Sequence, residues 1–395
     1  MRLPNSQINY FEVMKSMKIS PRKKIIFASV ATLVLCSVVF LILEIYLRIA
    51  KDYVDLDQFT GKKPGVSNPN KQWAFIDAFC AFSPQPGQRY TFGKLTNKTV
   101  NDHGFFSTPP ISAKKPQGTI RILFLGGSST AGTGHNLQDT DTWPWQTIDL
   151  LRKRLPTKKI DFINGSCAGY STFESYGRLW SRLRHFSPDI VVMNHAWNEM
   201  QYFAQAENIH QWRVLKNSSW KFQDIHKVVK LYEPHWVDHF VKYSQLLIRI
   251  RFQFSTLING EIGQVAEQEL QTDFNHKGLS ILQTNFKLIR ETCSVIDAKL
   301  FVAKQATLIS TNTLPQHRTK CRCEYHGFNY DAHIRAFEAI YNTIDKEFAA
   351  KSVIDLTSLS GQPDYFFDHV HPTPLGCKKI AEIVAEKLVW YIKNK

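Results

Sequence analysis

Two blocks of the sequence could together perform nucleophilic chemistry. The first is GGSST at residues 126–130, where two glycines precede Ser128. Two glycines permit a sharp turn after a strand, which would present the Ser128 hydroxyl at the edge of a sheet. A helix-capping turn explains the same residues, whereas a phosphate-binding loop would end in Gly-Lys-Ser/Thr and does not fit. Ser128 is therefore a candidate nucleophile that needs a base.

The candidate base lies in DHVHP, residues 368–372. Asp368 precedes His371 by three residues, so its carboxylate can accept a hydrogen bond from one ring nitrogen while the other nitrogen faces a nucleophile. Pro372 disfavours helical dihedral angles at His371, and the ring should therefore project from a loop. His369 and His371 could instead ligate a metal, but they lack a nearby cluster of further ligands, and we expect no metal or cofactor.

Two further blocks offer donors for a developing negative charge. NGSCAGY, residues 164–170, contains Gly169, and a glycine can bring a backbone N–H close to a carbonyl oxygen. HAWNE, residues 195–199, contains Asn198, whose side-chain amide could donate to the same oxygen. A loop glycine and a helix-capping asparagine are the simpler interpretations.

Short apolar runs alternate with helical stretches, and three of the four blocks begin where such a run ends. This alternation is typical of a parallel sheet covered on both faces, whose ligand site lies at the carboxyl ends of the strands. We expect an α/β fold, a three-layer α/β/α sandwich around a five-stranded, mainly parallel sheet. The predicted strands are 120–125, 160–164, 190–193, 300–303 and 352–355, and the predicted helices include 142–155, 173–185 and 374–392.

The blocks GGSST, NGSCAGYS, HAWNE and DHVHP, in this order, closely resemble those of the SGNH, or GDSL-like, hydrolases. The resemblance spans residues 121 to 388 and implies a flavodoxin-like sheet and a serine enzyme that acts on esters. The roles that it implies are a nucleophile at Ser128, an acid and base pair at Asp368 and His371, and oxyanion donors at Ser128, Gly169 and Asn198.

Three positions depart from the family pattern. Gly127 stands where many members have aspartate, Ala196 where the third block usually has glycine, and Glu199 where it usually has aspartate. None of these changes removes the nucleophile or a proton carrier. They leave open the substrate subgroup and the way in which the oxyanion loop is braced.

The resemblance implies a serine esterase acting on an acyl or acetyl ester of a glycan, a lipid or a small molecule. One alternative is an O-acyltransferase that modifies a cell-envelope polysaccharide, because a site that excludes water could pass the acyl group to a sugar hydroxyl. A second alternative is a non-catalytic envelope protein that binds a glycan or lipid in the same pocket. The sequence does not distinguish the substrates.

An uncharged run at residues 25–43 predicts a transmembrane helix. Its 19 residues, at about 1.5 Å each, nearly cross a hydrocarbon core of about 30 Å. The run exceeds the apolar region of a cleavable signal peptide and passes directly into Glu44. Basic residues precede it and acidic residues follow it, so we expect residues 1–24 in the cytoplasm and the catalytic domain in the periplasm, lumen or exterior.

The rest of the chain is expected to form a lead-in and a catalytic domain. Residues 44–118 are rich in Pro, Gly, Asn and Lys and predict an irregular lead-in packed on the domain at 119–395. EIYLR at 44–48 and VNDHGF at 100–105 also resemble membrane-anchored family members. A helical insert at about 200–282 carries Trp212, Trp220 and Trp236, which could bind a carbohydrate or acyl group or simply pack. Inside it, residues 243–254 mix basic and apolar types, and the two arginines there, Arg249 and Arg251, argue against a second span.

Composition and charge argue against a nucleic-acid-binding protein. The 395 residues are 43% apolar and carry a net charge of +15, of which residues 1–51 contribute +6, eight basic against two acidic residues. No basic stripe with interleaved aromatics is present, so we expect no nucleic-acid partner, and anionic lipid or an acidic polymer accounts for the charge. Pairing among Cys80, Cys293, Cys321 and Cys323 is open, and Cys321, Cys323 and His326 could hold zinc.

Overall fold

The computed structural model describes residues 20–50, 74–87, 89–92, 96–133, 135, 137–204, 238–258, 270–323 and 327–394. The chain divides into two compact units, one of Met1–Asn68 with Lys230–Ile262 and one of Pro69–Val229 with Gly263–Lys395. Trp212, Trp220 and Trp236 of the expected insert lie outside the described residues. The domain boundaries expected from the sequence stay predictions.

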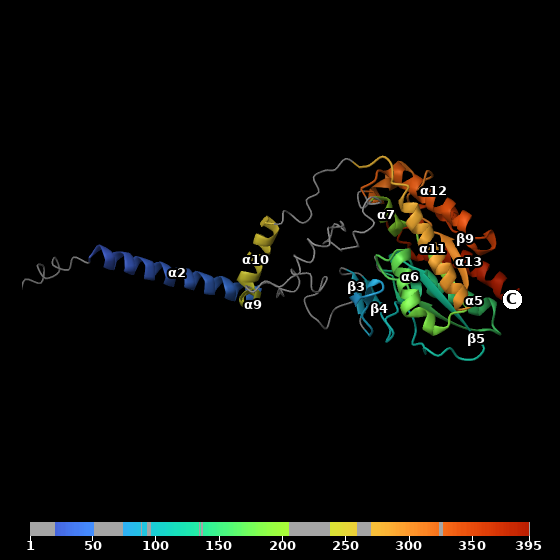
Figure 1. The fold of residues 1–395 in the computed structure, drawn as a ribbon, viewed down its shortest axis with the longest axis horizontal. Helices are drawn as coiled ribbons and strands as arrows, with labels where there is room; N and C mark the ends of the chain where they lie inside the picture. Colours follow the sequence, from blue (N-terminus) through green and yellow to red (C-terminus); the bar gives the residue numbers. More distant parts are fainter. Residues whose placement is uncertain are drawn as a thin grey trace, which may run out of the picture. The chain divides into compact units, whose positions relative to one another are not determined.

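The larger unit is built on a five-stranded parallel sheet in the order β6-β5-β7-β8-β9 (Figure 1). Each predicted strand is present, and the α/β sandwich fold is confirmed. The order reverses at β5, which has β6 on one side and β7 on the other, and a crevice at such a point is where open α/β sheets bind ligands. The strands are β5 Thr119–Gly126, β6 Lys159–Asn164, β7 Ile190–Asn194, β8 Lys299–Lys304 and β9 Val353–Asp355.

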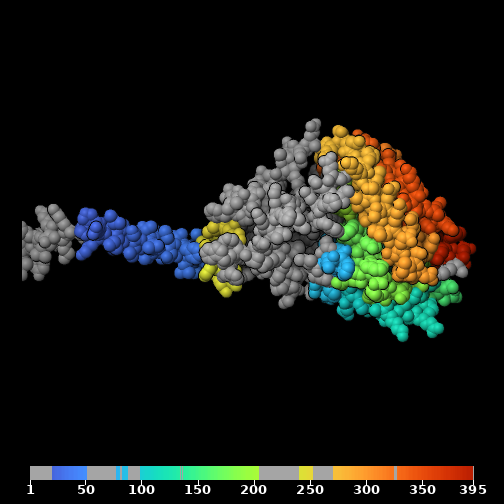
Figure 2. All heavy atoms as spheres, viewed as in Figure 1, coloured from blue at the N-terminus to red at the C-terminus, as the bar shows by residue number. Residues whose placement is uncertain are grey.

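Helices cover both faces of this sheet. Helix α5 (Trp143–Arg154) packs with α13 (Pro374–Lys393), and α11 (Gly278–Val295) packs with α6 (Thr172–Ser181) and with α12 (Tyr330–Glu347). Figure 2 shows α6 and α11 side by side on the surface. Burial on both faces explains why the strands are continuous apolar runs without alternation.

The prediction of a helix at 173–185 is confirmed for most of its length and wrong at its end. Helix α6 ends at Ser181, and a 3-10 turn, Leu183–Phe186, follows it. Ser187 then takes a left-handed conformation with φ of 50°. Pro188 disfavours helical dihedral angles at Ser187, and the chain must reverse direction within this turn to enter β7.

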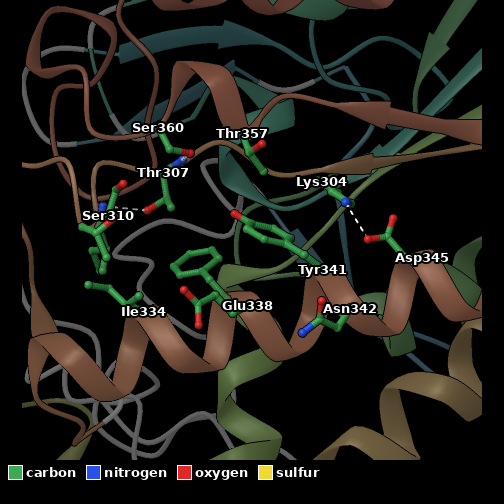
Figure 3. A pocket seen from close by; sticks show the side chains of 13 residues that line it. Lys304, Thr307, Ser310, Ile334, Glu338, Tyr341, Asn342, Asp345, Thr357 and Ser360 are labelled. Carbon is green, nitrogen blue, oxygen red and sulfur yellow. Dashed lines mark hydrogen bonds and ion pairs between the residues drawn. The ribbon is translucent and has the colours of Figure 1, made fainter. Parts of the chain in front are cut away.

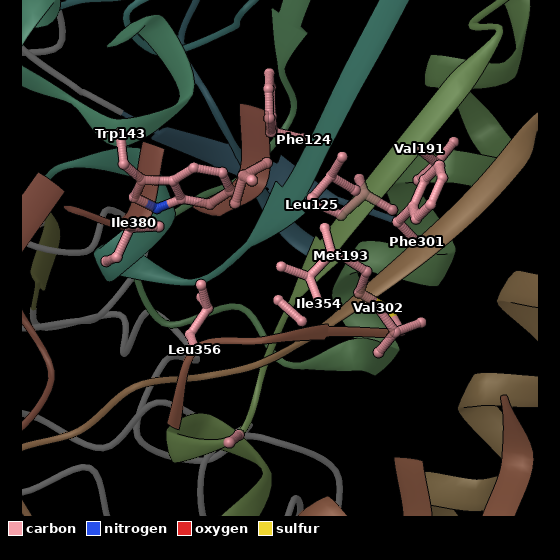
Figure 4. Close-up of a cluster of buried hydrophobic side chains, with 14 of the residues drawn as sticks. Phe124, Leu125, Trp143, Val191, Met193, Phe301, Val302, Ile354, Leu356 and Ile380 are labelled. Carbon is pink, nitrogen blue, oxygen red and sulfur yellow. The ribbon is translucent and has the colours of Figure 1, made fainter. Parts of the chain in front are cut away.

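Buried apolar side chains, aliphatic and aromatic, pack on the sheet (Figure 4). Phe124 of β5 meets Trp143 of α5 edge-on, with ring centroids 5.2 Å apart, and Phe301 of β8 meets Tyr391 of α13 at 5.4 Å. Phe124 and Phe301 are both fully buried. This core fixes the positions of the strand ends that carry the polar blocks.

The expectation of an irregular lead-in is wrong in part. Residues 74–99 contain two antiparallel pairs, β1 (Ala74–Asp77) with β2 (Ala81–Pro84) and β3 (Arg89–Phe92) with β4 (Thr96–Thr99). The segment that follows is held by Asn101, whose side-chain oxygen accepts the backbone N–H groups of His103 and Phe105, each at 3.0 Å. Local turns of this kind are not visible in composition alone.

The smaller unit contains helix α2 (Pro21–Ala50), α9 (Asp238–Val241) and α10 (Gln245–Ile258). Among the described residues, α2 is the one helix whose length and apolar character would suit a membrane span, with a mean hydropathy of 2.8 and no burial over its most apolar window. A signal sequence near an N-terminus shares these properties, so they alone do not assign its role.

None of the seven cysteines, all of which are described, forms a disulfide in this structure. Cys80 is buried beside Tyr170, whose hydroxyl lies 3.3 Å from its sulfur, and Cys293 is buried in the main core. Burial raises the pKa of Cys293 to about 12, which keeps the thiol protonated at neutral pH. His326, the third member of the possible zinc group, lies outside the described residues.

Arg178 of α6 ties the lead-in to the loop after β6. Its side chain is almost fully buried, and its guanidinium donates to the carbonyls of Gly165 at 3.0 Å, Ser166 at 3.4 Å and Gly104 at 2.5 Å. Hydrogen bonds to a charged group contribute more than neutral ones, and a buried carbonyl left without a donor carries a desolvation cost.

We therefore expect Arg178→Met to lower the free energy of unfolding by about 3 kcal/mol or more. Arg154→Met, which changes an exposed arginine of α5, should cost less than about 0.5 kcal/mol. Urea unfolding followed by tryptophan fluorescence checks both values. Equal stabilities of the two variants would show that Arg178 does not hold these loops.

Candidate active site

Ser128 lies at the carboxyl end of β5, where the chain enters the short helix α4 (Ser128–Ala131). Space is limited around both preceding glycines, most severely at Gly126. A Cβ atom at Gly126 would overlap the Thr130 side chain, and one at Gly127 would lie 2.6 Å from Nδ2 of Asn198. Gly127 has a φ of −86°, which any residue can adopt. A side chain at 127 would displace the end of the Asn198 side chain here.

The imidazole of His371 connects Ser128 with Asp368. Its Nε2 lies 2.7 Å from Oγ of Ser128, and its Nδ1 lies 2.7 Å from Oδ2 of Asp368. Because the ionised carboxylate can only accept, Nδ1 donates to Asp368, which leaves Nε2 as the acceptor for the Ser128 hydroxyl. The structure thus brings together the three residues that the sequence singled out as nucleophile, base and acid.

A tight turn holds Asp368 and His371 in this relation. Oδ1 of Asp368 accepts the backbone N–H groups of Val370 at 3.0 Å and His371 at 2.9 Å. The N–H of Phe367 donates to the carbonyl of His371 at 2.9 Å. The carboxylate therefore fixes the backbone of the turn with one oxygen and the His371 ring with the other.

His135 is a site residue that the sequence analysis missed. Its Nε2 donates to Oδ2 of Asp368 at 3.0 Å, and its ring stacks on Phe367 with centroids 4.4 Å apart. Burial by itself raises the pKa of Asp368, but the hydrogen bonds from His135 and His371 outweigh it and hold that pKa below its usual range. The sequence feature that could have indicated His135 was a histidine in the loop just after the GGSST block.

The imidazoles of His135 and His371 and the carboxylate of Asp368 also form a compact group. Their ligand atoms all lie within 4.8 Å of one another, which is close enough for a divalent cation. Both ring nitrogens of His371 are, however, engaged with Ser128 and Asp368. A cation would have to replace these hydrogen bonds, so the geometry suits proton transfer better.

Asn198 lies beside Ser128, the candidate nucleophile. Its Nδ2 donates to the carbonyl of Tyr170 at 2.8 Å, and the amide carries a second hydrogen. Ser128 and Asn198 both line a small cavity of about 10 Å³, enough for roughly one water molecule. Gly169 does not line this cavity, and its φ of 79° is the left-handed conformation that favours glycine.

Glu199 braces the loop that carries these groups. It is fully buried, and its carboxylate accepts both the backbone N–H and the hydroxyl of Thr172, each at 2.8 Å. Thr172 begins α6, directly after the block that contains Gly169. The glutamate thus joins the second and third blocks, and an aspartate would be one methylene shorter.

Gln305, directly after β8, is a second residue that the sequence analysis missed. Its Oε1 accepts the N–H of Trp197 at 2.9 Å, and its Nε2 donates to Oγ of Ser129 at 2.8 Å. The side chain is buried and joins the first block to the third. A polar residue at a strand end was the signal that could have indicated it.

His369 takes a structural position. Its ring lies 4.0 Å from that of Trp197, and it is 5% exposed. Its carbonyl accepts the Thr307 hydroxyl and the Leu308 N–H, both at 2.8 Å. Burial lowers the pKa of His369 to about 3, so its ring is neutral in the folded protein at neutral pH.

A larger pocket of about 430 Å³ lies between β8 and α12 (Figure 3). Lys304 and Asp345 form an ion pair of 2.7 Å at one end, Ser310 and Thr307 line the other, and Tyr341 lies between them. None of the four sequence blocks lines it. Thr307 nevertheless connects it to the turn of the site through the His369 carbonyl.

No family model and no curated protein matches the chain. Solved structures with a similar fold include the lipase Lip_vut3 from a goat rumen metagenome, at 13% identity and a TM-score of 0.39, covering 68% of this chain and 97% of that one. A putative GDSL-like lipase from Parabacteroides merdae has 13% identity and a TM-score of 0.37, with 71% and 98% covered. The acetyl xylan esterase AlAXEase has 15% identity and a TM-score of 0.35, with 68% and 98% covered. At these values the likeness gives no role to a residue.

The buried ring of His369 generates a prediction about pH. Its folded pKa is lowered from 6.5 to about 3, so the unfolded chain binds a proton that the folded protein does not, and stability falls as pH falls below 6.5. Between pH 6.5 and 5 this group alone should cost on the order of 2 kcal/mol.

We expect His369→Phe to weaken the loss of stability between pH 7 and pH 5, measured by urea unfolding at both values. His185→Phe, which replaces an exposed ring, is the matched control and should leave the pH dependence of the parent unchanged. If His369→Phe loses as much stability in acid as the parent does, His369 is not the group responsible.

Proposed function

We propose that the chain is a membrane-anchored serine esterase of the SGNH type. It hydrolyses a carboxylic ester, carried by a glycan, a lipid or a small molecule, through a covalent acyl-enzyme. The observation that carries this proposal is the hydrogen-bonded chain from Ser128 through His371 to Asp368. Its members lie up to 243 positions apart in the sequence and meet at the point where the strand order reverses.

The chemistry follows from the order of these contacts. His371 Nε2 takes the proton of Ser128 as Oγ attacks the ester carbonyl, and Asp368 stabilises the imidazolium that forms. His371 then protonates the departing alcohol, which leaves the acyl group on Ser128. A water molecule gives its proton to His371 and attacks the acyl carbon, and the carboxylic acid leaves as Ser128 regains its proton.

The low pKa of Asp368 supports this role. An ionised carboxylate accepts from Nδ1 of His371, so in the neutral imidazole the proton is held on Nδ1 and Nε2 is the acceptor. His135 contributes by donating to the same oxygen. We assign His135 a positioning role, because its ring contacts Asp368. The ring that contacts Ser128 is that of His371.

The negative oxygen of the tetrahedral intermediate needs donors. We assign the backbone N–H groups of Ser128 and Gly169 and the second amide hydrogen of Asn198 to this task. The contacts of Asn198 with Tyr170 and of Glu199 with Thr172 support it, because they fix these groups before charge develops.

Helix α2 serves in this proposal as a permanent anchor with residues 25–43 in the bilayer. Large apolar side chains such as Leu33 (67% exposed) and Leu35 (64%) are left largely uncovered by the part of the chain that the structure describes, and lipid would cover them. By the positive-inside rule the N-terminus is cytoplasmic and the catalytic unit lies in the periplasm, lumen or exterior.

We expect a fluorophosphonate probe to label the purified chain covalently at Ser128. Ser128→Ala should abolish both labelling and the hydrolysis of p-nitrophenyl esters of graded chain length. Ser294→Ala, an exposed serine of α11, should keep both. Unlabelled but folded parent protein would favour the binding protein over the enzyme.

Product analysis separates hydrolysis from acyl transfer. The chain is incubated with an acyl donor, with and without a glycan acceptor, and the products are resolved by mass spectrometry. Free acid alone supports the esterase, whereas acylated glycan would identify an O-acyltransferase. Both outcomes keep Ser128 as the nucleophile.

Asn198→Ala should lower kcat for ester hydrolysis by two to three decades, since the loss of one oxyanion donor typically costs about 3 to 4 kcal/mol in barrier. The thermal unfolding temperature should change little, because the amide is partly exposed. Asn342→Ala, which removes an exposed amide from α12, is the control. A kcat for Asn198→Ala within a factor of ten of the parent would remove Asn198 from the oxyanion site.

A further inference from the structure

One acidic side chain near the end of α2 is engaged with a helix from a distant part of the sequence. Glu44 is 8% exposed and directly follows the apolar run. Its carboxylate accepts the backbone N–H groups of Gln245 and Leu246, each at 2.9 Å, and the hydroxyl of Ser244 at 2.8 Å. Some 200 positions of sequence separate the two sides of this contact.

These bonds attach the first turn of α10 to α2. The N–H groups at a helix start lack partners within the helix, and here Glu44 accepts two of them while Ser244 accepts a third, from Leu247 at 3.1 Å. Arg48 strengthens the junction by donating to Glu44 at 2.7 Å and to the carbonyl of Tyr243 at 2.7 Å. A cleaved signal sequence would leave this helix start without its acceptor, so the contact favours a retained anchor.

The contact between Glu44 and the start of α10 determines the depth at which α10 lies relative to a bilayer. If residues 25–43 cross the hydrocarbon core, Glu44 lies where the helix leaves it. Figure 1 shows α10 crossing the direction of α2 at this end of the helix. A helix attached there, across the axis of the span, lies along the membrane surface.

The composition of this element suits an interface. Phe240, Tyr243 and Ile250 are 68%, 71% and 42% exposed, and Figure 2 shows part of this element at the surface beside α2. Residues 238–258 carry three basic residues and one acidic residue, and Lys242 lies over the Tyr243 ring at 4.9 Å. Interfacial helices combine apolar and aromatic side chains with basic ones that attract anionic lipid.

The described length of α10 is too short for a second span. Helix α10 has 14 residues, or about 21 Å, against a hydrocarbon core of about 30 Å. It also contains Arg249 and Arg251, two charged residues that a hydrocarbon core disfavours. The same residues that argue against a span favour a helix at the level of the headgroups.

We propose that α9 and α10 form a membrane-surface element, held at the end of the span by Glu44, that binds anionic phospholipid. Phe240, Tyr243 and Ile250 enter the boundary of the acyl chains, and Lys242 and Arg251 face phosphate groups. This inference rests on the proposed anchor and is independent of the ester chemistry.

The test uses the full chain in nanodiscs of phosphatidylcholine with or without phosphatidylglycerol. The photoreactive residue p-benzoyl-phenylalanine replaces Tyr243 or Ile250, and for the control it replaces Val295, an apolar residue of α11 that is 78% exposed. After irradiation, intact mass spectrometry separates lipid adducts from protein crosslinks. We expect lipid adducts at 243 and 250 at least about five-fold above those at 295.

Charge reversal tests the choice of lipid. Lys242→Glu with Arg251→Glu should lower phosphatidylglycerol adducts at position 250 by about five-fold or more, since each basic residue near an anionic surface contributes roughly a five-fold change in affinity. Lys378→Glu, an exposed lysine of α13, should have no effect. Unchanged adducts in the double variant would overturn the anionic specificity.

The outcomes separate this inference from the proposed anchor. A chain that resists extraction from the bilayer at alkaline pH but crosslinks at 243 and 250 only to protein, its own or another copy, overturns the surface element and keeps the anchor. A chain that alkali releases overturns both. Fluorophosphonate labelling of the same samples reports on the esterase separately.

Discussion

The carboxylate of Asp368 accepts four hydrogen bonds in a partly buried position, and the rest of the site depends on them. Two come from backbone N–H groups of its own turn and two from the rings of His135 and His371. One carboxylate accepts hydrogen bonds both from the backbone of the turn and from the His371 ring. It therefore determines the shape of the turn and the direction of the ring at the same time. Burial would otherwise favour the neutral acid, which could not hold His371 in the required tautomer.

The parallel sheet brings the site residues together because the loops after neighbouring strands start from the same edge. Strands β5 and β7 end side by side, with Gly126 paired to Asn194, so the nucleophile block and the Asn198 block start from the same edge. Buried polar side chains then join the loops to one another. Glu199 connects the third block to the start of α6, and Gln305 connects it to Ser129. Such bonds let irregular loops keep a fixed geometry.

In the smaller unit, too, a carboxylate side chain accepts backbone N–H groups, but it joins two helices there. Glu44 is a buried carboxylate that accepts backbone N–H groups, and it attaches α10 to α2 as Asp368 attaches its turn to a ring. In both places a short acidic side chain organises backbone that lacks partners of its own. The difference lies in the surroundings, a turn of the candidate active site in one case and a proposed membrane surface in the other.

The sequence by itself determined the five strands and the order of the four blocks. Strands buried on both faces must be continuous apolar runs, so local pattern was sufficient to predict the sheet. The four blocks were ambiguous one by one, and it was their order, with the family resemblance that it carries, that singled out Ser128, Asp368, His371 and Asn198. The strands of the lead-in and the end of α6 at Ser181 were not predicted, because short turns depend on few residues.

Only the tertiary structure decided the roles of His135, Gln305 and Glu44. Each acts through a contact with a residue far along the chain, 233 positions away for His135 and Asp368 and about 200 for Glu44 and Ser244. No local pattern encodes such a partner, because the contact exists only after packing of the helices and sheet has brought two separate loops to the same place. A lone histidine or glutamate therefore reads as an ordinary polar residue until the chain is folded.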